Sequence, residues 1–124
     1  MDDESQWIEK RAHPRVKRRF VMRVRPKEGA DLRWEVPTLK DISLAGCYFF
    51  SGTKFDVGHI LELEIQLPVM EHPMHFLGQV KRVEPQSNIS ITQYGVAIQF
   101  VEMEISKKDK LEQIINFSLK RQSP

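Results

Sequence analysis

Two stretches of the chain alternate between apolar and polar side chains. They read RFVMRVR, over residues 19–25, and HILELEIQL, over residues 59–67. A period of two places alternate side chains on opposite faces of an extended chain, so each stretch predicts a half-buried β-strand. The side chains expected to face the core are Phe20, Met22 and Val24 in the first strand and Leu61, Leu63, Ile65 and Leu67 in the second.

Four further segments are predicted to form strands, which gives about six in all. The segments between them combine Gly or Pro with Asn, Asp or Ser, residues that suit tight turns; two such breaks are RPKEGAD and EPQSN. In the last strand, Val96, Ile98 and Phe100 fall on one face. The four segments are LRWEVPTLKDI, CYFF, MHFLGQVKRV and YGVAIQFV.

The end of the chain, SKKDKLEQIINFSLKRQ, predicts an amphipathic helix. Leu111, Ile114 and Ile115 recur at helical spacing, and Ser106 followed by Asp109 resembles a capping box. Many short antiparallel strands followed by one helix favour a small barrel, because closure leaves no exposed strand edges. The helix is expected to cover an open end or a side of this barrel.

The composition fits one soluble globular domain. With 124 residues, of which 40% are hydrophobic and 29% charged, the chain can bury a core and is not of the disordered class. Its apolar runs are shorter than the roughly 20 residues of a membrane span, and its opening, MDDESQ, does not resemble a signal peptide. The single cysteine, Cys47, fits a small buried residue. These features together predict a cytoplasmic protein without a membrane span.

The basic charge of the chain is concentrated near its start. The formal net charge of +2 is too small for binding long duplex DNA through the whole surface. Between Lys10 and Lys27, however, there are nine Lys or Arg residues and no acid, whereas the segment from Asp56 to Glu71 carries four acids and no Lys or Arg. This distribution indicates a local anionic target.

A short polar motif, DISLAG, lies between two apolar runs and has two interpretations. It forms either a tight turn, in which Asp41 and Ser43 cap backbone groups and Gly46 supplies a positive φ, or part of a guanine site. A carboxylate accepts hydrogen bonds from the N1–H and the exocyclic amine of guanine, and a glycine lets the base approach the main chain. Arginines add forked donors for phosphate and flat faces that stack on bases.

The basic run and the polar motif together resemble a known family. The R-x-x-x-R pattern of Arg11 and Arg15, followed by D-x-S-x-x-G, resembles the signature of PilZ domains, bacterial receptors for cyclic di-GMP, and FLGQVKRV and YGVAIQF resemble two later strands of that family. The expected fold is a six-stranded antiparallel PilZ-like β-barrel with a C-terminal α-helix. We expect a flexible tail over residues 1–8, the barrel with its arginine arm over residues 9–104, and the helix over residues 105–121.

The resemblance also implies roles for individual residues. Arg11 and Arg15 are expected to bind the ligand's phosphates and to stack on guanine, and the ligand is expected to draw their segment against the barrel. Asp41 and Ser43 are expected to read guanine and sugar edges, while Gly46 allows close approach. These are the ligand-binding residues that the motif itself supplies.

Two further positions extend this candidate site. Many family members have an aromatic residue where this chain has Arg82, so the resemblance implies either that Arg82 stacks on guanine through a cation–π contact or that this wall of the guanine site is missing. Lys10 directly precedes the arginine motif. Family members take one ligand or a stacked pair, and a long cation beside Arg11 supplies a countercharge for the pair without crowding it, so we expect two cyclic di-GMP molecules per chain. By contrast, Arg23 and Arg25 are expected to be charges on a solvated strand face.

The predicted function is that of a non-enzymatic cyclic di-GMP receptor that changes conformation on binding and signals to a downstream protein. One alternative is a small barrel that binds single-stranded nucleic acid, but this needs exposed aromatics, and those here fall mainly at expected core positions such as Phe49 and Phe50. Another is an interaction module without a ligand, which would show an eroded motif. No metal or other cofactor is expected, since the four histidines give one close pair, HPMH, and nothing near Ser43 resembles a hydrolase nucleophile elbow.

Overall fold

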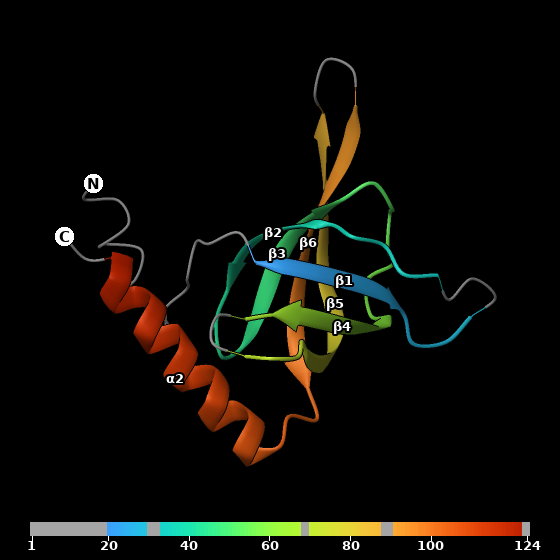
Figure 1. Cartoon of the computed structure of the whole chain (residues 1–124). Helices are drawn as coiled ribbons and strands as arrows, with labels where there is room; N and C mark the ends of the chain where they lie inside the picture. Colours follow the sequence, from blue (N-terminus) through green and yellow to red (C-terminus); the bar gives the residue numbers. More distant parts are fainter. Residues whose placement is uncertain (1–19, 30–32, 68–69, 88–90, 123–124) are drawn as a thin grey trace.

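A single antiparallel sheet and one long helix make up the described part of the chain. The computed structural model describes residues 20–29, 33–67, 70–87 and 91–122 (Figure 1). The expected tail over residues 1–8, and Lys10, Arg11 and Arg15, lie outside this part. The elements are β1 (Val21–Pro26), β2 (Thr38–Ile42), β3 (Gly46–Ser51), β4 (Ile60–Gln66), β5 (Met74–Ser87), β6 (Thr92–Val101) and α2 (Ile105–Gln122).

The six strands form one curled sheet in the order β1-β4-β5-β6-β3-β2. The two ends of this sheet approach each other where an isolated bridge pairs Val24 of β1 with Glu35, which lies in the segment before β2. The backbone N–H of each of these residues donates to the carbonyl oxygen of the other at 2.8 Å. The sheet thus curls into a half-barrel, and the six-stranded antiparallel architecture expected from the sequence is confirmed.

The apolar residues that alternate along β1 and β4 are also the buried residues of these strands. Met22 and Val24 on β1 are buried and pair with Ile65 and Leu63 on β4, which are buried as well. The expected core residues of the two alternating stretches are confirmed, except that Phe20 is only partly buried against the core. Cys47 is buried, as its small apolar character indicated.

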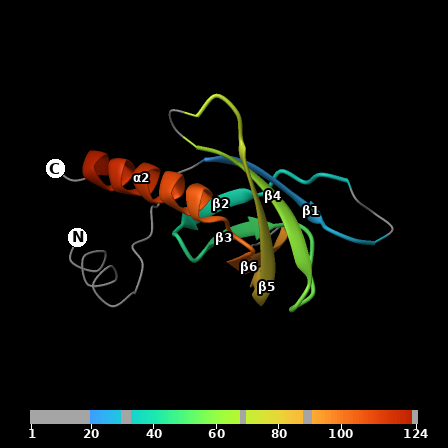
Figure 2. The ribbon, with the colours of Figure 1, turned by 90° about the horizontal axis from the view of Figure 1, so that it is seen from below.

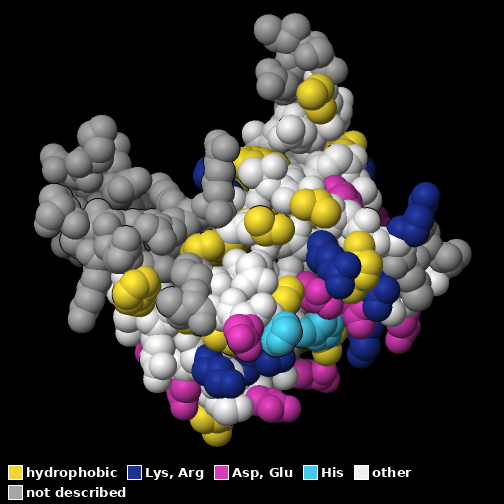
Figure 3. Space-filling model, viewed as in Figure 1, with side chains coloured by type: hydrophobic (Ala, Val, Ile, Leu, Met, Phe, Trp, Pro, Cys, Tyr) yellow, Lys and Arg dark blue, Asp and Glu magenta, His cyan; other side chains and the backbone are white. Residues whose placement is uncertain are grey.

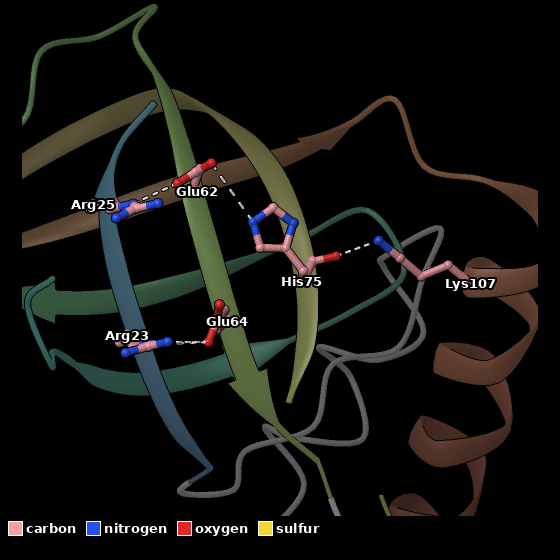
Figure 4. A network of polar contacts seen from close by, with 6 residues as sticks. All are labelled: Arg23, Arg25, Glu62, Glu64, His75 and Lys107. Carbon is pink, nitrogen blue, oxygen red and sulfur yellow. Dashed lines mark hydrogen bonds and ion pairs between the residues drawn. The ribbon is translucent and has the colours of Figure 1, made fainter. Parts of the chain in front are cut away.

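The outer face of β1 and β4 carries the polar side chains of the same alternation. Figure 3 shows basic, acidic and histidine side chains mixed on this side of the molecule. Figure 4 shows Arg23 reaching Glu64 and Arg25 reaching Glu62, with N–O distances of 2.8 and 2.6 Å. Both guanidinium carbons also lie 4.3 Å from the ring centroid of Trp34. Arg23 and Arg25 are therefore strand-face charges, as expected.

Two strand boundaries differ from the expected ones. Only the second half of LRWEVPTLKDI is a strand, since β2 begins at Thr38, directly after the buried Pro37. In the other direction, β5 continues to Ser87 through the predicted break EPQSN, and forms with β6 a hairpin that extends beyond the rest of the sheet (Figure 1). Pro85 is tolerated there because β5 pairs with β4 only as far as Gln79, so this part of β5 is an edge strand.

The C-terminal helix forms as predicted and spans Ile105–Gln122, but the expected capping box does not form. It starts at Ile105, and the Lys108 N–H donates to the Glu104 carbonyl at 3.0 Å, so Ser106 lies inside the first turn and is not the N-cap. Near this end, Lys107 donates to the His75 carbonyl oxygen at the start of β5. Figure 2 shows the rest of α2 extending beyond the strands. The buried face of the helix comprises Leu111, Ile114 and Ile115, the residues with helical spacing.

Candidate ligand-binding site

The D-x-S-x-x-G motif forms the turn that connects β2 to β3. The Ser43 N–H donates to the Gly46 carbonyl at 2.8 Å, and the Ser43 hydroxyl oxygen accepts from the N–H groups of Ala45 and Gly46 at 3.2 and 3.4 Å. Ser43 is buried, with 3% of its surface exposed. The serine therefore caps the turn, as the first interpretation of the motif holds.

Gly46 is required for a different reason than a left-handed turn. Its φ is not positive; the glycines with positive φ among the described residues are Gly29 and Gly58. A Cβ on Gly46 would instead lie 1.8 Å from the carbonyl oxygen of Ile98 on β6. The expectation of a positive φ is wrong, and what the glycine permits is the close approach of β3 and β6.

A register shift places Asp41 on the outer face of the sheet. Leu39 pairs with Phe49, and both are core residues, but the next pair is Asp41 with Tyr48, which leaves Lys40 as an extra residue on β2. Without this bulge, Asp41 would follow Leu39 into the core at a spacing of two. A bulge reverses the facing of the residues after it, so Asp41 shares a face with Tyr48.

A second register shift does the same for Arg82 on β5. Val80 pairs with Ile98 in the core, and the next pair is Arg82 with Ala97, so Lys81 is the extra residue. On the other side of β6, Ala97 pairs with Tyr48. Four paired residues from β2, β3, β6 and β5 thus form one transverse row on the outer face, which we call the outer row: Asp41, Tyr48, Ala97 and Arg82.

Tyr48 is the polar side chain of the outer row that sequence reasoning missed. Its hydroxyl lies over Gly95, where a Cβ would come within 1.9 Å of the oxygen, and donates to Glu84 at 3.4 Å. Burial, followed by the nearby Glu84 carboxylate, raises the pKa of the Tyr48 hydroxyl, so the hydroxyl stays protonated and a donor at neutral pH. Its alternation with Phe49, which is fully buried, was the signal that could have revealed an outward tyrosine.

Phe50 also departs from its expected core position. It is partly buried and pairs with Gly95, and its ring lies edge-on to Tyr48 with centroids 5.5 Å apart. The Lys40 ammonium lies 5.7 Å from the Tyr48 ring centroid and 5.6 Å from that of Phe50. The face beside the D-x-S-x-x-G turn therefore combines aromatic rings with cations, a surface suited to stacking on nucleobases.

The outer row lies apart from two large cavities that described residues line. These cavities, of about 510 and 520 Å³, lie near β1 and the segment before β4, and their linings include Trp34, Phe55 and His59 but no residue of the outer row. Among the described residues, no group of three or more His, Cys, Asp or Glu side chains could hold a metal ion. None of the helices described is long and apolar enough to cross a membrane.

Of the seven candidate ligand-binding residues, the structure brings some together and does not describe others. Asp41 and Arg82 lie in the outer row, and Asp41 has 3% of its surface exposed, whereas the Arg82 side chain is 62% exposed. Ser43 and Gly46 lie in the adjoining turn. Lys10, Arg11 and Arg15 lie outside the described residues. The described part of the candidate site is therefore a sheet face and a turn that the arginine motif precedes in the sequence.

Comparison with known proteins identifies the family. The PilZ domain family matches residues 9–117. The fold is similar to the Escherichia coli YcgR PilZ domain with c-di-GMP, at 20% identity and a TM-score of 0.70, covering 90% of this chain and 92% of that one. It is also similar to the K. pneumonia MrkH–c-di-GMP complex, at 22% identity, a TM-score of 0.67 and coverages of 91% and 54%.

A third similar structure is the Bacillus subtilis inhibitor of motility MotI/DgrA, at 20% identity, a TM-score of 0.66 and coverages of 90% and 51%. The chain thus spans about half the length of MrkH and MotI, and nearly all of the YcgR domain. A comparison with curated protein sequences finds no match. The family match covers most of the chain and includes both sequence motifs, so this chain belongs to the PilZ domain family.

Proposed function

We propose that this protein is a receptor for cyclic di-GMP that binds the ligand on the outer row and the adjoining turn. The observation that carries the proposal is the pair of bulges that brings Asp41, Tyr48 and Arg82 onto one face. Family membership supports it, and so do the similar structures of YcgR and MrkH, which are complexes with the same ligand. Bulges commonly re-aim side chains beside functional sites.

Each group in the site has a chemical role in this proposal. The Asp41 carboxylate accepts from the N1–H and amine of a guanine, and the rings of Tyr48 and Phe50, with the Arg82 guanidinium, offer faces for stacking. Ser43 caps the turn and thereby fixes the sheet edge beside the ligand. Arg11 and Arg15 supply forked donors to the phosphates when the ligand draws their segment against the barrel.

The proposed mechanism is a conformational change rather than catalysis. Clustered arginines before β1 repel one another, and an anionic ligand between them and the outer row offsets this repulsion. The change exposes a new surface, through which the signal passes to a downstream protein in the cytoplasm. No chemical step is needed for this function.

The experiment that tests the proposal is a titration of the protein with cyclic di-GMP, GTP, cyclic GMP and a short single-stranded RNA. We expect micromolar or tighter binding of cyclic di-GMP and much weaker binding of the mononucleotides, because a ligand with two guanines and two phosphates engages both motifs together. Equal affinity for GTP would contradict the proposal.

Single-stranded nucleic acid is the second candidate ligand, and Lys40 beside the rings of Tyr48 and Phe50 is the observation that favours it. Tighter binding of the RNA than of cyclic di-GMP would make it the better assignment.

The stoichiometry of binding tests the role proposed for Lys10. A stacked ligand pair carries four phosphate charges, and Lys10 beside Arg11 adds a countercharge. We expect calorimetry to read two cyclic di-GMP molecules per chain, and the Lys10→Leu variant to read closer to one. A count of one for the unaltered protein would refute the role of Lys10 but leave the receptor proposal intact.

A further inference from the structure

A second carboxylate, besides that of Asp41, stands among the cations and aromatic rings of the proposed binding face. Glu84, two residues after Arg82 on β5, pairs with Gly95 on β6 and so lies in the row next to the outer row. Its Oε1 accepts from Arg82 Nε at 3.0 Å and from the Tyr48 hydroxyl at 3.4 Å. The same oxygen therefore contacts both side chains of the outer row that can donate hydrogen bonds to a ligand.

The fold does not need this carboxylate in the way that it needs the neighbouring glycines. The Glu84 side chain is 46% exposed and that of Arg82 is 62% exposed, and exposed ion pairs contribute little to stability. By contrast, the space beside Gly46 and Gly95 is filled by backbone or by Tyr48. The question is why an acid that is paired with Arg82 stands on a face proposed to receive an anion.

A negative charge at this place opposes an anionic ligand in two ways. It repels the ligand's phosphates directly, because water and salt only partly screen charges that lie close together on a protein surface. It also holds the Arg82 guanidinium by its Nε–H and neutralises it, so a ligand that stacks on or pairs with Arg82 must first compete with Glu84.

We infer that Glu84 is an affinity-setting residue: it holds Arg82 and Tyr48 in the free protein and weakens the binding of an anionic nucleotide, so that ligand binding requires Arg82 to exchange partners. This inference rests on the proposed function and deepens it. The receptor is tuned to respond at a higher ligand concentration than its cations alone would set. When Arg82 leaves Glu84, a side-chain contact at the base of the β5–β6 hairpin is lost, so ligand binding changes the contacts of this hairpin.

The test compares Glu84→Gln with Glu64→Gln by calorimetric titration with cyclic di-GMP. Both variants remove one negative charge from an Arg–Glu pair, but the Arg23–Glu64 pair lies on β1 and β4 (Figure 4), two strands that contribute no residue to the outer row. Glutamine keeps the shape of the side chain and an oxygen that can accept from Tyr48. We expect Glu84→Gln to bind about three- to ten-fold more tightly than the unaltered protein, and Glu64→Gln to bind unchanged.

A second comparison separates the release of Arg82 from simple charge repulsion. When Arg82 is replaced by alanine, the gain from Glu84→Gln should shrink, because no guanidinium remains to be released. Thermal unfolding of each variant shows whether the barrel is intact. In a Tyr94→Phe background, the ultraviolet titration of Tyr48 should move to lower pH in Glu84→Gln, since the carboxylate helps to raise the pKa of that hydroxyl.

The outcomes distinguish this inference from the proposed function. If the unaltered protein binds cyclic di-GMP and Glu84→Gln binds no more tightly than Glu64→Gln, Glu84 does not set the affinity, although the receptor proposal stands. If the unaltered protein does not bind cyclic di-GMP, the proposed function fails and the inference fails with it. An unchanged Tyr48 titration would show that Glu84 does not hold the tyrosine in solution.

Discussion

Replacing Arg15 by alanine should weaken the binding of cyclic di-GMP by on the order of 2 kcal/mol or more, which is roughly thirty-fold. The reason is that a charged, forked donor to a phosphate is lost while the phosphate remains. Asp41→Ala should cause a loss of similar size, because the guanine donors that it serves are left without an acceptor. Calorimetric titration of each variant measures the effect.

The matched control for Arg15 is Arg25, which belongs to the same basic run. Its guanidinium pairs with Glu62 at 2.6 Å and lies over Trp34, on the outer face of β1 and β4, two strands that contribute no residue to the outer row. Arg25→Ala should therefore change ligand binding little. A loss as large as that of Arg15→Ala would mean that the ligand responds to diffuse basic charge and not to a site. Because Asp41 is buried, its variant also needs a measurement of unfolding, and Asp41→Asn serves as the conservative comparison.

Gly46→Ala should lower the free energy of unfolding by about 3 kcal/mol or more, although it adds only one methyl group. The added Cβ would lie 1.8 Å from the Ile98 carbonyl oxygen and 2.8 Å from the Ile98 carbonyl carbon. Both atoms belong to the backbone of β6, which hydrogen bonds to β3 and β5 hold in place. Urea unfolding followed by circular dichroism measures the change in the free energy of unfolding.

Gly52→Ala provides the control for this substitution. A Cβ on Gly52 meets no atom within 4 Å, and its φ is not positive, so alanine fits without strain. We expect its free energy of unfolding to stay within about 0.5 kcal/mol of that of the unaltered protein. If Gly46→Ala is as well tolerated as Gly52→Ala, the close approach of β3 and β6 is not a constraint on the fold.

The sequence by itself determined the strands whose two faces differ in polarity. Along β1 and β4 the apolar residues recur with a strict period of two, and that period is a local property of an extended chain. The buried face of α2 was equally readable, because Leu111, Ile114 and Ile115 follow the helical period. The two motifs carried the family assignment, which the family comparison confirmed over residues 9–117.

The ends of the elements were less accessible to sequence reasoning. A proline normally interrupts a strand, so EPQSN was predicted to be a break. In the fold, Pro85 continues β5 because the β4 side of the strand has no partner there among the described strands. Whether a proline interrupts a strand depends on which strands pair with it, and the residues of the strand itself do not reveal its partners.

Only the tertiary structure decided which residues meet on the binding face. Simple alternation assigns Asp41 to the same face as Leu39, and Arg82 to the same face as Val80, and in both cases that face is the core. One extra residue on β2 and one on β5 reverse this assignment and place both charged side chains beside Tyr48. A bulge is a property of the register between two strands, so the pattern of residues within one strand does not predict it. For the same reason, the contact of Glu84 on β5 with Tyr48 on β3 could be identified only from the pairing of the strands.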